Sequence, residues 1–358
     1  MQRVVGLDAI RFVCAAVVAL GHIHLALADQ LSPVIGRTAA TGVDIAFSNG
    51  FNGPAAVMVF FVLSGFVIHL PQARGRRLDV AQFAARRYLR IVPPVAVFML
   101  ASVALGYAPE GGYWMHTVLW SVICELVYYT LYPALLASRI PMARLGLGAL
   151  GIALVFTALN FSQITSGDLS YTVFGWWTPV IGLPVWILGA VLAERYQRLP
   201  VLRARTMWTI RAGVLLGSAA LRVLAYHGEP YVGPFASNAI TLTLLAPLIG
   251  AWLGLEVVHF QSRPGVSRTL AVLETAGAAS FSLYLAHPLA LELVPAPEGG
   301  GDLALLGVSV LAASAATAAF YLLVERPSHR AARRAGQAIA RRRAMAMVPA
   351  RPRRAPEA

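Results

Sequence analysis

The chain contains no lysine, because all 29 of its basic residues are arginine. A lysine that forms a Schiff base with a carbonyl substrate, or that serves as an amine nucleophile, is therefore excluded. The formal net charge at neutral pH is +13, and arginine alone carries its positive part.

Cysteine is also scarce, with Cys14 and Cys124 as the two examples among 358 residues. Both lie inside apolar runs, which is typical of small buried side chains. A disulfide framework or a cysteine-ligated zinc site would need more cysteines at closer spacing. Such a disulfide framework or zinc site is therefore not expected; we also expect no other metal site and no bound cofactor.

Charged residues of either sign are few: they make up 13% of the chain, whereas hydrophobic residues make up 58%. Soluble domains average about 25% charged and about 45–50% apolar residues. The mean hydropathy of +0.67 agrees with this difference. The composition excludes an ordinary soluble domain and favours an all-α, polytopic membrane protein.

Apolar runs long enough to cross a bilayer, about 17–25 residues each, recur along the whole chain. We expect ten spans, near residues 9–28, 54–70, 91–107, 116–137, 143–160, 174–193, 206–226, 235–257, 275–294 and 303–324. Counting Arg3, Arg11 and the tail after residue 324 with the alternate loops, 27 of the 29 arginines fall on one side of the membrane, and the excess of basic residues on cytoplasmic segments places both termini in the cytoplasm. Residues 1–326 form the expected membrane domain, and the basic segment 327–358 is expected to be a disordered cytoplasmic tail.

Ionisable side chains inside membrane spans are rare and usually functional. Arg11 and His22 are eleven positions apart, so on one helix they lie within about 20° of the same face and about 16 Å apart. This spacing suits a long ligand with an anionic end at Arg11 and a reactive end at His22. The alternative is an arginine reaching to the interface and a histidine that merely bonds a neighbouring helix.

The stretch WSVICELVYY, Trp120 to Tyr129, places Glu125 near the middle of the fourth expected span. A carboxylate there needs a partner, and His22 lies at a similar expected depth. Such a pair would raise the basicity of the imidazole and fix its tautomer. Arg222, Tyr128 or a purely structural hydrogen bond are alternatives.

A third stretch, FAARRYLRIVPP, places Arg86, Arg87 and Arg90 where a cytoplasmic loop re-enters the membrane. Guanidinium groups bind phosphate in bidentate geometry. The alternative is that these arginines only set the topology.

These stretches together resemble one family, the acyltransferase 3 integral membrane acyltransferases of sugars and other hydroxylated acceptors. The matching segments follow in order: GLDAIRFVCAAVVALGHIH at 6–24, VFFVLSGFVIHL at 59–70, RRYLRIVPP at 86–94, LWSVICELVYYTLYP at 119–133, SFSLYLAHP at 280–288 and VERPSHR at 324–330. One departure stands before the second segment, where the chain reads NGPAAVMV and many members have Gly-Val-Asp.

The resemblance implies transfer of an acyl group, usually acetyl from acetyl-CoA, to a hydroxyl of a cell-envelope glycan or a small product, in a bacterial inner membrane. It implies that His22 is the essential histidine, with Arg11 as its signature partner. In the mechanism that we expect, His22 is the general base and Glu125 orients it. The expected donor or substrate contacts are Arg86, Arg87, Arg90, Ser64, His69, Trp120, Tyr128 and His287. Direct transfer and an acyl-enzyme both remain open, as do the acceptor and the acyl group.

Two other classes of function compete with this interpretation. A transporter or flippase of a glycan or lipid-linked substrate would also need intramembrane charge and a basic cytoplasmic rim. A non-catalytic scaffold would gain nothing from buried Arg, His and Glu side chains. Nucleic acid is not expected as a partner, because the membrane topology already explains the positive charge.

Overall fold

The computed structural model describes residues 4–107, 117–263, 265, 267–295 and 301–346, and over these residues the chain is helical. The first half contains α1 (Leu7–Leu20), α2 (Leu27–Ile35), α3 (Arg37–Gly50), α4 (Gly53–Ala73), α5 (Val80–Ala104), α6 (Leu119–Ala137), α7 (Met142–Leu159), α8 (Phe161–Thr165) and α9 (Thr178–Arg195). The second half contains α10 (Ala204–His227), α11 (Glu229–Val232), α12 (Asn238–Gln261), α13 (Arg268–Gly277), α14 (Ser280–Glu292), α15 (Leu303–Phe320) and α16 (Arg326–Ala346). Short 3₁₀ helices η1 (Gly175–Trp177), η2 (Tyr196–Arg198) and η3 (Gly233–Ala236) and the π-helical turn η4 (Tyr321–Glu325) complete the described part. The all-α prediction is confirmed.

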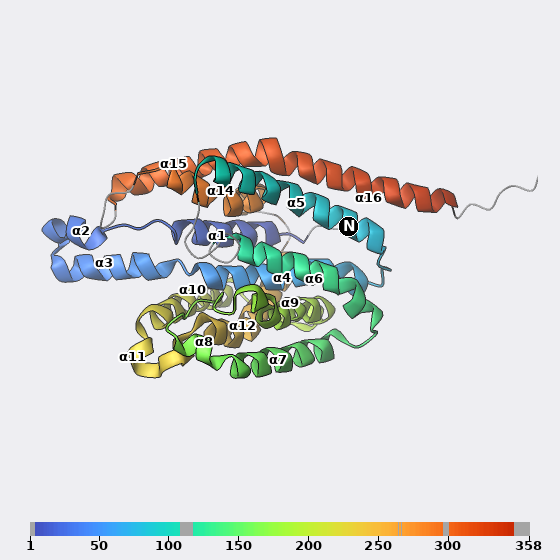
Figure 1. Ribbon diagram of the computed structural model, residues 1–358, viewed down its shortest axis with the longest axis horizontal. Coiled ribbons are helices and arrows are strands. Elements are labelled where there is room, and N and C mark those ends of the chain that lie inside the picture. The colour runs from blue at the N-terminus through green and yellow to red at the C-terminus, as the bar shows by residue number, and fades with distance from the viewer. Residues whose placement is uncertain (1–3, 108–116, 264, 266, 296–300, 347–358) are drawn as a thin grey trace, which may run out of the picture.

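The long helices run side by side along the longest dimension of the molecule (Figure 1). Within the described residues, eight helices are long and apolar enough to cross a membrane, and the pair α13 and α14, bent by 66°, forms a ninth candidate. The first expected span is only partly helical, since α1 has 14 residues and ends at Gly21. The described start of the chain and the end of α16 lie at the same end of the bundle, which we call the arginine-rich end and which the charge rule assigns to the cytoplasm.

The centre of the bundle is α4, which packs most closely against α9. The backbones approach so tightly that a Cβ on Gly65 would collide with the carbonyl oxygen of Trp186, and one on Gly189 would collide with that of Val62. Small residues allow such close approach between membrane helices, where dispersion forces rather than water exclusion drive association. This α4–α9 pair is the rigid support on which α1, α5, α6 and α14 are arranged.

Two motifs far apart in sequence meet where α14 packs against η4. The carboxylate of Glu325, which is buried, accepts hydrogen bonds from the backbone N–H of Ser282 at 3.0 Å and from its hydroxyl at 2.5 Å. A π-helical turn often marks a functional position in a helix. Here it brings Glu325 to the first turn of α14 and so fixes that helix near the centre of the bundle.

The prediction of a disordered tail is wrong for residues 327–346, which continue from η4 as the helix α16. This helix packs along α5 (Figure 1). The amide of Gln82 donates to the carbonyl of Gly336 at 2.9 Å, and Arg343 pairs with Asp79 at 2.9 Å. Because these partners belong to α5 and its N-cap, tertiary contacts order a segment whose composition alone is polar and basic. Residues 347–358 of the expected tail lie outside the described residues.

Candidate functional site

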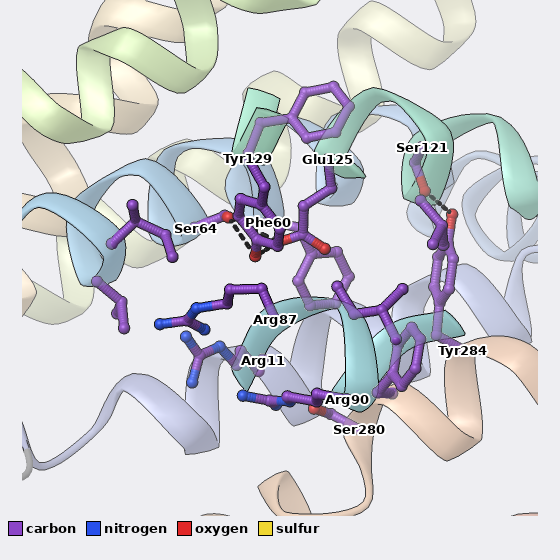
Figure 2. A pocket seen from close by; sticks show the side chains of 16 residues that line it. Arg11, Phe60, Ser64, Arg87, Arg90, Ser121, Glu125, Tyr129, Ser280 and Tyr284 are labelled. Atoms are coloured by element: carbon purple, nitrogen blue, oxygen red, sulfur yellow. Dashed lines mark hydrogen bonds between the residues drawn. The ribbon is translucent and has the colours of Figure 1, made fainter. Parts of the chain in front are cut away.

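A cavity of about 110 Å³ lies between α1, α4, α5, α6 and α14 (Figure 2). Among the described residues that line it are three arginines, Arg11, Arg87 and Arg90, and one carboxylate, Glu125. Figure 2 shows the three guanidinium groups gathered on one side, whereas Ser121 and Tyr284 lie at the opposite end. Since Arg87 and Arg90 stand near the start of α5, the arginines mark the cavity end that is nearer the arginine-rich end.

Local structure explains why Arg87 and Arg90 share the cavity and Arg86 does not. The side chain of Asp79 accepts a hydrogen bond from the N–H of Gln82, which fixes the start of α5. Residues three apart on a helix lie on one face, whereas neighbours point about 100° apart. Arg86 therefore lies against Gly336 of α16. Arg86 does not line this cavity, so the cavity gives no support to the predicted contact between Arg86 and the donor.

Arg11 is positioned by the N-terminus of α1. The N-cap residue Gly6 has a φ of 91°, a left-handed conformation that glycine adopts without strain. The Glu274 carboxylate accepts hydrogen bonds from the N–H groups of Gly6 and Ala9 at 2.8 and 3.2 Å. A carboxylate at a helix N-terminus satisfies free donors and complements the helix dipole. Arg11 itself pairs with Asp8 at 2.6 Å.

Arg87 packs over aromatic rings in the cavity wall. Its guanidinium carbon is 5.9 Å from the Phe83 ring centroid and 5.7 Å from that of Tyr129. Such cation–π contacts stabilise a partly desolvated cation by about 0.5–2 kcal/mol and leave its N–H donors available.

The carboxylate of Glu125 is the acceptor of a hydroxyl network between α4 and α6. Ser64 donates to it at 2.6 Å, and Tyr129 also donates to it. Trp186 extends the network by donating from Nε1 to the Ser64 hydroxyl at 3.2 Å. The expected pairing of Glu125 with His22 is therefore wrong, because packing turns this carboxylate towards α4 instead. The two other side chains that were expected as partners of Glu125 form hydrogen bonds elsewhere. Tyr128 donates to the carbonyl of Pro179, and Arg222 donates to the carbonyl of Phe51.

The far end of the cavity is closed by Tyr284, whose hydroxyl bonds to Ser121 at 2.7 Å and also contacts the Val118 carbonyl at 3.1 Å. Its ring centroid is 5.8 Å from that of Phe60 and 6.3 Å from that of His287. Phe60 packs against a small cluster formed by Ala15 and Ala19 of α1, which lie between Arg11 and His22 in the chain, and Leu283 of α14. The two aromatic side chains therefore separate the cavity from the histidines beyond.

His22 lies two residues past the end of α1, so the ideal-helix spacing to Arg11 does not extend to it. It belongs to the non-helical stretch 21–26, where Gly301 donates to the carbonyl of His24 and accepts from the N–H of Ala26. Non-helical backbone at membrane depth is tolerated where protein surrounds it or where it lines a cavity. The side chain of His22 is exposed.

The partner of His22 is His287, which is completely buried. Nδ1 of His22 donates to the Val18 carbonyl at 2.8 Å and lies 3.4 Å from Nε2 of His287. Nδ1 of His287 donates to the Leu283 carbonyl at 2.9 Å. Because a carbonyl oxygen only accepts, both protons are assigned to Nδ1. The exposed imidazole of His22 thus carries its lone pair on Nε2.

Three further expected contacts lie outside the cavity. His69 is held between Glu194 at 3.1 Å and Tyr132 at 3.0 Å. Trp120 packs edge-on against Phe61 and at a tilt against Tyr171. With Tyr128, these residues pack around the site, and their contact with a substrate stays a prediction. Among the described residues, no group of three or more His, Cys, Asp and Glu side chains could hold a metal ion.

The sequence reasoning missed Tyr129 and Tyr284 as cavity residues. Tyr129 is four positions after Glu125, and this helical spacing could have favoured it over Tyr128. Tyr284 stands one turn before His287 in the segment SFSLYLAHP, but nothing in the spacing indicates its contact with Ser121 of α6.

Comparisons with known proteins identify the family of the chain. The model of the acyltransferase domain family matches residues 4–325. The acyltransferase MdmB of Streptomyces mycarofaciens is 29% identical over 280 residues, which cover 66% of this chain and 67% of that protein. No solved structure matches the chain significantly. Since the family model spans every helix that builds the cavity and the histidine pair, the chain belongs to the acyltransferase 3 family and is a membrane acyltransferase.

Proposed function

We propose that this acyltransferase takes an acetyl or other short acyl group from acyl-CoA at the cytoplasmic face of a bacterial inner membrane. It transfers the group to a hydroxyl of a cell-envelope glycan or similar acceptor. One observation carries the proposal: Arg11, Arg87 and Arg90 converge at one end of a cavity, and beyond its other end His22 rests on His287.

The arginine cluster suits the anionic end of the donor. Three guanidinium groups face the cavity against the one carboxylate among its described lining residues. Arginine forks form bidentate hydrogen bonds with phosphate oxygens. Arg11, Arg87 and Arg90 would hold the donor phosphates, and Glu125 would keep Arg87 in place through the adjacent Tyr129.

The acyl-bearing arm of the donor must reach His22 past Phe60 and Tyr284. The cavity of about 110 Å³ is smaller than the roughly 300–1,000 Å³ that drug-sized ligands occupy. Donor binding therefore requires these two aromatic side chains to move. Both side chains lie along one route, since Phe60 packs against the cluster of Ala15, Ala19 and Leu283 and Tyr284 stands one turn before His287 on α14.

At the far end, Nε2 of His22 acts as general base. It accepts the proton of the acceptor hydroxyl as the hydroxyl oxygen attacks the thioester carbon. The new C–O bond forms, the C–S bond breaks, and the proton passes to the departing CoA thiolate. His287 holds the imidazole of His22 and stabilises its charge by accepting from Nδ1. The alternative is acylation of His22 first: Nε2 attacks the thioester carbon and the C–S bond breaks to release the CoA thiolate, after which the acceptor hydroxyl forms the C–O bond as the N–C bond to His22 breaks and its proton passes to solvent or the thiolate.

The test uses purified protein in detergent with acetyl-CoA labelled in the acetyl group, and follows free thiol, labelled product and label on the protein. We expect donor turnover by the wild type and a loss of about 10²–10⁴-fold in His22→Ala. His24→Ala is the matched control, since His24 is also exposed in the same stretch and its backbone bond to Gly301 is kept. Undiminished turnover in His22→Ala contradicts the mechanism, and label retained on wild-type protein favours the acyl-enzyme. Transport needs a sealed bilayer, so product formation in detergent also separates the enzyme from a flippase.

A further inference from the structure

A second and larger cavity, of about 850 Å³, lies on another side of α1, between α1 and α13 on one wall and α10 and α12 on the other. We call it the lateral cleft. The face of α1 that lines it carries Ala9, Val13 and Val17 at intervals of four residues, and Val5 lines it just before the helix begins. Such spacing forms one stripe on a helix. This stripe is apolar, unlike the face that carries Arg11.

Protein side chains do not close the lateral cleft. Val13 is 48% exposed, and on the opposite wall Leu215 is 56% and Trp208 67% exposed, although all three line the cleft. Of the 24 residues of α10, Met207 is the one fully buried. The described walls thus present a long apolar hollow that hydrocarbon can enter.

We call the end of the cleft that is farther from the arginine-rich end its outer end. This outer end lies against the stretch that carries His22. Val17 lines the cleft, and the next carbonyl, of Val18, holds the imidazole of His22. From the other wall, Ser218 accepts from the Asn52 amide at 2.8 Å, and both residues line the cleft.

One turn beyond Ser218 on α10, Arg222 donates to the Phe51 carbonyl at 2.9 Å. That same carbonyl oxygen abuts Gly21, the residue before His22. The outer end therefore carries the polar residues Asn52 and Ser218 and lies next to Gly21, one residue before the proposed base.

The inner end does not suit the phosphates of the donor. Of the two arginines that line the cleft, Arg263 is exposed at its rim, and Arg211 is bound by Glu256 in a bidentate pair at 2.7 and 2.8 Å, with Trp252 donating to the same carboxylate at 2.9 Å. A guanidinium held in this way has its charge neutralised. The first cavity therefore fits the donor, and the lateral cleft fits an apolar chain.

We propose that the lateral cleft binds the hydrocarbon chain of an amphiphilic acceptor, whose hydroxyl-bearing head lies at the outer end beside His22. The identification of this amphiphile as the acceptor rests on the proposed function. The acceptor would thus reach the base from within the bilayer, on one side of α1, while the donor arrives on another side.

The test is photolabelling in lipid nanodiscs with dodecyl glucoside that carries a diazirine on its chain. The readout is the labelled residues, identified by mass spectrometry. We expect labelling at Val13, Val17 and Leu215, reduced at least fivefold by excess dodecyl glucoside and not by methyl glucoside. The variant Val13→Trp should reduce this labelling at least fivefold, because the larger side chain fills the cleft. We expect the same reduction from Leu215→Trp on the opposite wall.

The matched control is Leu147→Trp, since Leu147 on α7 is 70% exposed and lines neither cavity. Labelling spread over exposed helix faces, unaffected by competitor or by both cleft variants, would mean bulk lipid only and would overturn the proposal. Because labelling needs no turnover, His22→Ala should label like the wild type. A failed donor assay with intact cleft labelling would therefore reject the proposed chemistry and keep the chain-binding site.

Discussion

Nε2 of His287 lies 3.4 Å from Nδ1 of His22, and their ring centroids are 5.0 Å apart at an interplanar angle of 52°. The buried ring of His287 is itself anchored to the Leu283 carbonyl one turn earlier on α14. A buried imidazole that accepts from Nδ1 fixes the tautomer of the exposed imidazole and directs its Nε2 lone pair outward. The orienting group that the sequence suggested, Glu125, serves a different part of the site.

The first prediction concerns this histidine pair. His287→Ala should lower kcat by about 10- to 100-fold, because a hydrogen bond to a charged group contributes about 1.5–3 kcal/mol. The donor KM should change less than about twofold, since His287 does not line the cavity that contains Arg11, Arg87 and Arg90. His287→Gln, which can offer an acceptor oxygen to His22, should recover part of the loss. Steady-state kinetics of the three proteins would measure both constants, and a raised donor KM at unchanged kcat would contradict the assignment.

The second prediction separates the arginines of one motif. Arg87→Gln and Arg90→Gln should each raise the donor KM about tenfold or more, because each removes charge-assisted hydrogen bonds to phosphate. Arg86→Gln is the control and should leave the donor KM within about twofold, because Arg86 lies against α16. Titration of acetyl-CoA in the detergent assay measures the effect. An equal rise in the donor KM at all three positions would reject the cavity that contains Arg11, Arg87 and Arg90 as the phosphate site.

The third prediction tests the hydroxyl network around Glu125. Tyr129→Phe removes the hydroxyl that donates to Glu125 but keeps the ring under Arg87, 5.7 Å from its guanidinium carbon. We expect kcat/KM to fall about tenfold, because the carboxylate loses a donor and Arg87 loses its fixed neighbour. The neighbouring Tyr128→Phe should change kcat/KM less than about twofold, since Tyr128 donates to Pro179 outside the cavity. The opposite order of the two effects would exclude Tyr129 from the site.

The fourth prediction concerns stability rather than chemistry. Gly65→Ala or Gly189→Ala should each destabilise the protein by about 1–3 kcal/mol or more, because the added methyl group collides with backbone across the α4–α9 contact. Gly148→Ala on α7 meets nothing within 4 Å and should stabilise its helix by about 0.5–1 kcal/mol. Thermal unfolding in detergent, followed by intrinsic fluorescence, would show a lower Tm for the first two variants and an equal or higher Tm for the control.

The class of the protein was readable from its sequence for a simple reason. Hydrocarbon excludes unpaired backbone groups and most charges, so apolar runs become helices and arginines collect at one end. The cavity arginines were also partly predictable, because Arg87 and Arg90 are three positions apart and must share a face of α5. The same spacing rule places Arg86 elsewhere, and applying it within the motif would have removed that residue from the predicted contacts.

The partners of the buried groups were decided by tertiary structure alone. Sequence gives the approximate depth of a side chain in the membrane, but its direction around the helix depends on what packs against it. Glu125 turns to Ser64, which is 61 positions away, and His22 turns to His287, which is 265 positions away. The helix α16 is a further case, because its order comes from contacts with α5 that its own composition does not indicate. Local pattern thus determined which residues enter the membrane, whereas the packing of α1, α4 and α14 decided which of them meet.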